Sequence, residues 1–107
     1  MENNLTGLFK DAISLGNGWW DFWFGYAYES ESGWFFHWDV GWVYLVEQDD
    51  KQIWMYFPQH GWMRVSRDHY PYYCHYIGKR WLYLIYADDR IAKFFDYAAE
   101  ELFTLEK

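Results

Sequence analysis

The sequence predicts an all-β fold, an antiparallel meander of about four hairpins of about twenty residues each. Tryptophan recurs at Trp23, Trp42, Trp62 and Trp81, so that successive repeats begin 19, 20 and 19 residues apart. Within each repeat, two aromatic or β-branched runs flank a short polar stretch, which is the pattern of a β-hairpin. Aromatic residues make up 27% of the chain, and such side chains pack well on a pleated sheet.

Turn signals lie both inside the repeats and between them. The polar stretches inside the repeats are residues 29–32, 48–51, 67–69 and 87–90. Gly41, Gly61 and Gly78 stand at the joints between repeats, where glycine adopts turn dihedrals that other residues resist. We therefore expect about eight strands over residues 19–105, closed into a barrel or divided into two facing sheets. The C-terminal stretch ELFTL, residues 101–105, is either a closing strand or a short helix.

The segment before Trp19 has a different pattern. Apolar residues recur there at the spacing of one helical face, at Leu5, Leu8, Phe9, Ala12 and Ile13. An asparagine precedes them as an N-cap, and the Gly-Asn-Gly stretch at 16–18 follows as a stop signal. We predict an amphipathic helix over residues 4–14, packed against the sheet because a helix this short is marginal alone.

Apolar side chains occupy both faces of most expected strands. Successive strand residues point to opposite faces, so Trp42 and Tyr44 share a face opposite Val43 and Leu45. One short helix cannot cover the second face of the whole sheet, and an outward aromatic surface is therefore expected. Contiguous exposed apolar surface usually marks an interaction site.

Length and composition limit the classes of protein to consider. The 107 residues suffice for one domain, 1–107. A net charge of -7 argues against direct nucleic-acid binding, which needs a basic surface. Cys74 is the only cysteine, so no disulfide forms within the chain, and its thiol is expected to be a small buried group. Neither a signal peptide nor a transmembrane segment is expected, and the sequence as written predicts a cytoplasmic protein.

No catalytic or cofactor motif stands out. The Asp-Asp pairs at 49–50 and 88–89 occupy equivalent turns, and aspartate closes turns through its own side chain, which favours a structural role over a catalytic pair. The histidines lack the arrangement expected of a zinc site, and His37 is expected to be a hydrogen-bonded core or edge residue. We therefore expect a protein that is not an enzyme and that needs no metal or cofactor.

Three long segments carry a resemblance to known proteins. WFGYAYESESGWFFHWDVGWVYL, IWMYFPQHGWMRVSRDHYPYYCHY and RWLYLIYADDRIAKFFDY together resemble the aromatic hairpin repeats found near the ends of many bacterial surface and secreted proteins. The resemblance covers residues 19–103 and implies a surface-associated or adhesive module without an assigned activity. Arg64 departs from it, since that family usually has an aromatic residue there.

A looser likeness joins GKRWLYLIY and GWVYLVEQDD to the strands of choline-binding and glucan-binding cell-wall repeats. In those modules, rings from neighbouring hairpins surround a quaternary ammonium through cation–π attraction. The second glycine of that motif is absent or displaced here, so the ligand does not carry over.

One region runs against the acidic composition of the chain. Between Gln59 and Arg80, four basic residues accompany a single acid, Asp68; they are Arg64, Arg67, Lys79 and Arg80. Arginine and tyrosine together favour interfaces and anionic groups. The region therefore predicts a local basic patch for an acidic group on a partner, with an ordinary mixed surface as the alternative.

These observations favour a non-enzymatic module for protein interaction or self-assembly that presents an aromatic surface. The expected contact residues are Trp42, Trp62, Arg64, Tyr70, Tyr72 and Trp81. Two alternatives remain at this point. One is a module that holds a carbohydrate or a quaternary ammonium between exposed rings. The other is a small acidic inhibitor or immunity-type protein that occupies a basic site on an enzyme.

Overall fold

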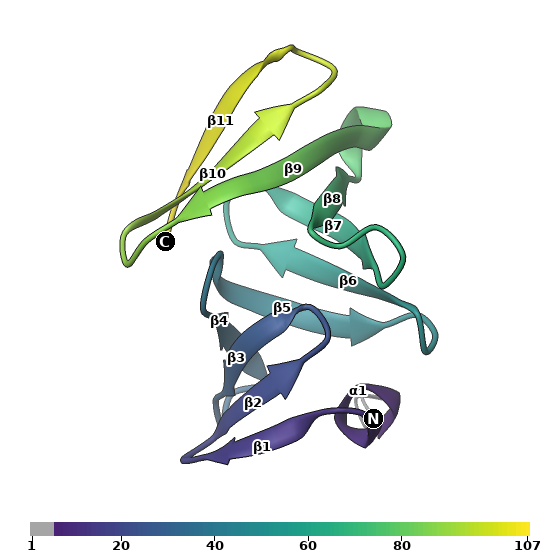
Figure 1. Cartoon of the computed structure of the whole chain (residues 1–107), viewed down its shortest axis with the longest axis vertical. Helices are drawn as coiled ribbons and strands as arrows, with labels where there is room; N and C mark the ends of the chain where they lie inside the picture. The colour runs from purple at the N-terminus through teal and green to yellow at the C-terminus, as the bar shows by residue number, and fades with distance from the viewer. Residues whose placement is uncertain (1–5) are drawn as a thin grey trace.

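A computed structural model describes residues 6–107 and confirms the all-β fold class. Eleven antiparallel strands form one sheet in which the order of the strands follows the order of the chain (Figure 1). The strands are β1 (Ile13–Gly16), β2 (Trp19–Phe22), β3 (Gly25–Glu29), β4 (Trp34–His37), β5 (Gly41–Glu47), β6 (Gln52–Phe57), β7 (Gly61–Ser66), β8 (Tyr72–His75), β9 (Arg80–Ala87), β10 (Ile91–Asp96) and β11 (Glu101–Glu106). A short helix, α1 (Thr6–Lys10), precedes them, and a 3₁₀ turn, η1 (Ile77–Lys79), lies between β8 and β9.

The repeats correspond to hairpins, as the sequence predicts. The four hairpins are β3–β4, β5–β6, β7–β8 and β9–β10. The C-terminal stretch is a strand, β11, which pairs with β10. Among residues 6–107, β1 and β11 each have only one neighbour, so the sheet is open. It is neither a closed barrel nor two separate sheets.

The N-terminal prediction is correct in type but wrong in extent. The helix spans Thr6–Lys10 rather than residues 4–14, of which residues 4 and 5 lie outside the described part. Ile13 belongs instead to β1, which pairs with β2. The Gly-Asn-Gly stretch is the turn of this additional hairpin, because Gly16, Asn17 and Gly18 all have positive φ (89°, 56° and 88°). An Asn-Gly turn with left-handed dihedrals suits a tight hairpin.

The core lies on one face of the sheet, called here the inner face. Buried inner-face side chains from β2 through β11 form a single cluster with Leu8 of α1; they include Phe22, Phe35, Leu45, Met55, Met63, Tyr73, Leu82, Phe94 and Leu105. One sheet can bring its first and last strands into the same cluster only by curling around it. Figure 1 shows this curl, with β1 to β5 in the lower half of the view and β9 to β11 at the top.

Contacts far apart in the sequence hold the curled sheet in shape. The Lys107 Nζ, at the end of β11, donates hydrogen bonds to the carbonyl oxygens of Trp38 and Asp88. The ring of His60 packs edge-on against Phe103, with centroids 5.0 Å apart. The last strand therefore reaches back to the β4–β5 and β6–β7 turns.

Three hairpins end in a polar residue that is buried and caps the following turn. The His37 Nδ1 accepts the backbone N–H groups of Asp39 and Val40, so its Nε2 carries the proton and donates to the Phe24 carbonyl at 2.6 Å. His75 and Asp96 end β8 and β10 in the same way. Because each cap satisfies otherwise orphaned backbone groups, these polar residues are compatible with burial.

No helix within residues 6–107 is long and apolar enough to cross a bilayer.

Candidate functional site: an outward aromatic surface

The face opposite the core, called here the outer face, carries rows of aromatic side chains on adjacent strands. Strand registers place these rings opposite one another: Trp19, Tyr28, Phe36 and Trp42 across β2 to β5, Trp34, Tyr44, Tyr56 and Trp62 across β4 to β7, and Tyr72, Tyr83 and Phe95 across β8 to β10. Ring contacts follow the registers, with centroids 5.4 Å apart for Phe36 and Trp42. The expected outward aromatic surface is therefore present.

At the β8–β10 end of this face, four rings gather around a shallow depression of about 380 Å³. The depression is lined by His69, Tyr72, Trp81 and Tyr97, called here the aromatic cluster. Trp81 is 38% exposed and Tyr97 is 49% exposed. None of the four is an acidic residue, a lysine or an arginine, so the lining combines ring faces with hydroxyl and ring N–H groups.

Each ring of the cluster is positioned by a different element. Tyr72 lies on β8 and Trp81 on β9, and these strands are paired. Tyr97 directly follows β10, and its backbone N–H donates to the Trp81 carbonyl at 3.1 Å. His69 lies in the β7–β8 turn and packs against Trp81 with centroids 5.8 Å apart. Strand pairing and turn closure thus bring together residues that are 28 positions apart, from 69 to 97.

Neighbouring rings of the same outer face support the cluster from the side. Tyr72 packs on Tyr83 with centroids 4.7 Å apart, and Tyr97 packs edge-on against Phe95 at 4.8 Å. A hydrogen bond with Tyr97 raises the pKa of the Tyr72 hydroxyl above its usual value of 10. Both rings are therefore held in place.

The structure brings together two of the six predicted contact residues, Tyr72 and Trp81. Trp42 lies on the outer face against Phe36 and is 45% exposed. Trp62 is half-buried on the same face, against Tyr56 at 5.2 Å.

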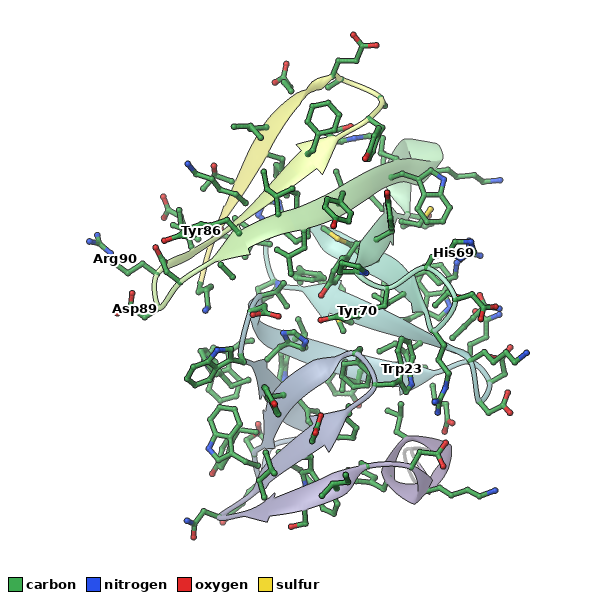
Figure 2. The ribbon with its side chains drawn as sticks, in the orientation of Figure 1. Trp23, His69, Tyr70, Tyr86, Asp89 and Arg90 are labelled. Carbon is green, nitrogen blue, oxygen red and sulfur yellow. The ribbon has the colours of Figure 1, made fainter. Side chains whose placement is uncertain are left out.

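Tyr70 does not lie on the outer face. It packs at the centre of the molecule against Trp23 and Tyr73 (Figure 2). Burial, followed by the charge of Asp39, raises the pKa of its hydroxyl to about 12. Tyr70 is half-buried there and joins the β2–β3 turn to β8.

The basic region divides rather than forming one free patch. Arg67 forms an ion pair with Asp11 at 2.8 Å and also lies over the Trp23 ring. Arg80 is paired with the buried carboxylate of Asp96. Arg64 is half-buried on β7, where it lies opposite Trp54 and Cys74 in register. Two of the four basic side chains thus already have acidic partners.

Sequence reasoning missed His69 and Tyr97 as members of the cluster. A signal for Tyr97 exists, because an aromatic residue directly follows each of the three buried caps: Trp38 after His37, Tyr76 after His75 and Tyr97 after Asp96. All three of these aromatic residues are exposed, between 49% and 63%. A residue next to a buried cap on a strand end must point away from the core, so the cap pattern predicts an exposed ring. No comparable signal marks His69, which depends on the path of its turn.

Other polar groups that the sequence singled out have structural roles. The Asp88 carboxylate accepts the backbone N–H groups of Arg90 and Ile91, and the Asp49 carboxylate accepts that of Lys51. These bonds confirm a turn-forming role for Asp49 and Asp88. Figure 2 shows Asp89 and Arg90 projecting from the β9–β10 turn, on the opposite side of the view from His69. Within residues 6–107, no group of three His, Cys, Asp or Glu side chains is placed to hold a metal ion.

No known protein family, curated protein or solved structure matches the chain.

Proposed function

We propose that this protein is a non-enzymatic interaction module whose outer face binds a protein partner or a second copy of the chain. The observation that carries the proposal is the aromatic surface on the side of the sheet away from the core, with Trp42 and Trp81 exposed on different parts of it. Tyrosine and tryptophan are enriched at protein interfaces, and rigid exposed rings give large contact areas at low entropic cost.

The ion pairs of two basic residues bear on which side chains would contact a partner. Ion pairing of Arg67 and Arg80 with Asp11 and Asp96 reduces the positive charge available to an acidic partner. We therefore assign the contact to the rings, and the net charge of -7 to solubility.

The proposal predicts that serine at both Trp42 and Trp81 abolishes association while the domain stays folded. Each ring is largely outside the core, so their removal takes away contact surface rather than packing. Light scattering over a range of concentrations would measure self-association as a mass above 13.3 kDa. Affinity capture from the source cells, read by mass spectrometry, would measure binding of other proteins.

Tyr76→Ser is the control, because Tyr76 is also an aromatic residue and is 63% exposed but lies beside η1, outside the aromatic rows. It should associate like the wild type. A wild-type protein that stays monomeric and captures nothing beyond what the double variant captures would reject the proposal.

A further inference from the structure

β11 is an edge strand that lacks the features by which natural sheets protect their edges. Natural edge strands are commonly short, bulged or interrupted by proline or lysine. β11 has six residues, ELFTLE, and keeps an unbroken register with β10 along its whole length. The other edge strand, β1, has four residues and an irregular register between Ser14 and Gly16. β11 is therefore the more regular template for a further strand.

Half of the backbone groups of β11 point away from the sheet. The N–H of Lys107, directly after the strand, donates to the Arg90 carbonyl at 3.0 Å. Successive residues of an antiparallel strand direct their N–H and C=O groups to alternate sides, so every second residue before Lys107 also bonds toward β10. The other three residues direct these groups to the free side, called here the β11 edge, and all three are exposed: Leu102, Thr104 and Glu106. No other strand within residues 6–107 pairs with them, and Figure 1 shows β11 at the margin of the sheet.

We propose that the β11 edge binds an extended segment of a protein partner, antiparallel to β11 and with a basic residue at each end. The inference rests on the proposed function for the presence of a protein partner, and it adds a contact beside that of the outer face. The segment would become a further strand of the sheet, the mode of recognition known as β-strand addition.

Backbone chemistry calls for an extended occupant. The free N–H and C=O groups recur at every second residue, which is the repeat of a neighbouring antiparallel strand. Pairing along the three residues of the edge would form about six hydrogen bonds. An α-helix cannot supply such a row, because its backbone groups are already bonded to one another.

Charge favours a basic segment. β11 begins with Glu101 and ends with Glu106, and both are exposed. The Nζ of Lys107 is held by the carbonyl oxygens of Trp38 and Asp88 in other turns. Opposite charges directly across paired strands are stabilising and like charges are destabilising. A second copy of the chain would bring an equally acidic strand and a further net charge of -7, which disfavours it as the occupant.

The middle of the segment is expected to be uncharged. Phe103 and Leu105 face the core, so apolar side chains opposite them would extend the inner face. Thr104 lies on the outer face, opposite Lys93 of β10 in register. A basic residue beside Thr104 would therefore approach a like charge. The edge thus predicts basic ends, apolar side chains on the inner face and neutral ones on the outer face.

Fluorescence anisotropy with two isomeric labelled peptides would test the inference on the full chain. Both peptides have the sequence Lys-Val-Thr-Val-Thr-Lys with blocked ends. Both valines are N-methylated in the probe, and both threonines are N-methylated in the comparison peptide. When the two lysines lie opposite Glu106 and Glu101, the threonine N–H groups point to β11 and the valine N–H groups point to solvent. We expect saturable binding of the probe and at least about tenfold weaker binding of its isomer, which loses two hydrogen bonds.

Variants of Thr104 then locate the binding. Thr104→Pro removes an N–H group that points to the free side, in the one orientation that edge strands tolerate, and keeps the bonds of Phe103 and Leu105 to β10. It should weaken the probe by about tenfold or more. Thr104→Val is the matched control, because it has the same shape and keeps the N–H, and it should bind like the wild type. Urea denaturation of each variant would show that the fold is retained.

Charge variants test the ends of the segment. Glu101→Gln and Glu106→Gln should each weaken the probe by about two- to fivefold at low salt, the usual effect of an exposed ion pair. Trp81→Ala, on β9, should leave the affinity unchanged.

Several outcomes would overturn the inference. They are failure of the probe to bind, equal affinity for the two isomers, or an affinity that does not respond to Thr104→Pro. A wild-type dimer that Thr104→Pro returns to a mass of 13.3 kDa in light scattering would assign the edge to a second copy instead. The association assay with the Trp42 and Trp81 double variant is independent of the peptides, so the proposed function can stand when this inference fails.

Discussion

Replacing Phe94 by alanine is expected to lower the free energy of unfolding by about 3–5 kcal/mol, the usual cost of removing a buried aromatic side chain. Phe94 is fully buried on β10. Its ring packs against those of Tyr73 and Phe103, with centroids 5.3 Å and 6.0 Å apart. The cavity would lie where β8, β10 and β11 meet. Urea denaturation followed by tryptophan fluorescence would measure the change.

Trp81→Ala is the matched comparison for this experiment. Trp81 lies on the neighbouring strand but faces outward, and its removal is expected to cost only about 1 kcal/mol. The larger side chain should therefore cause the smaller loss of stability. Similar losses for the two variants would contradict the assignment of inner and outer faces.

Mild acid is expected to destabilise the protein through His37. Burial lowers the pKa of this imidazole below 6.5, outweighing the hydrogen bond to Phe24 and the charge of Asp39, which act in the opposite direction. The unfolded chain takes up a proton near pH 6.5, before the folded protein does. Stability is therefore fully present above about pH 7.5 and falls as the pH drops through 6.5 toward the folded-state pKa.

His37→Gln provides the test, because glutamine does not titrate. At about pH 7.5 the variant should be less stable by about 2–3 kcal/mol, since the buried Phe24 carbonyl and the N–H groups of Asp39 and Val40 lose partners. Between about pH 7.5 and 5, its stability should depend less on pH than that of the wild type. The pKa of His60 is also lowered, chiefly by burial, so some dependence should remain. Parallel stability–pH curves for the two proteins would argue against His37 as the source.

The hairpins were predictable because each has its signals within about twenty residues. The interval between Trp23, Trp42, Trp62 and Trp81 marks the repeats, and the aspartates at 49 and 88 mark turns that their side chains close. Alternation along single strands also identified the two faces, as in Val43 and Leu45 opposite Trp42 and Tyr44.

The errors occur where local signals compete or where distant contacts decide. The sequence around Ile13 fits both a helix, by its apolar spacing, and a hairpin with an Asn-Gly turn. In the structure Ile13 pairs with β2. The single curled sheet depends on contacts such as that of Lys107 with Trp38, across 69 positions, which no periodicity reports. The aromatic cluster was half identified, because Tyr72 and Trp81 belong to the strand pattern whereas His69 and Tyr97 belong to turns.

The strand order of the sheet has a consequence for how such a protein is made and how it can change. Because every strand pairs with the one synthesised just before it, each new hairpin can add to a template that has already left the ribosome, without waiting for a distant segment. The same neighbour-to-neighbour arrangement would let a gene gain or lose whole hairpins by duplication or deletion, much as in solenoid proteins. The contacts of Lys107 and Phe103 with distant turns, and the packing of the shared core, would have to be rebuilt.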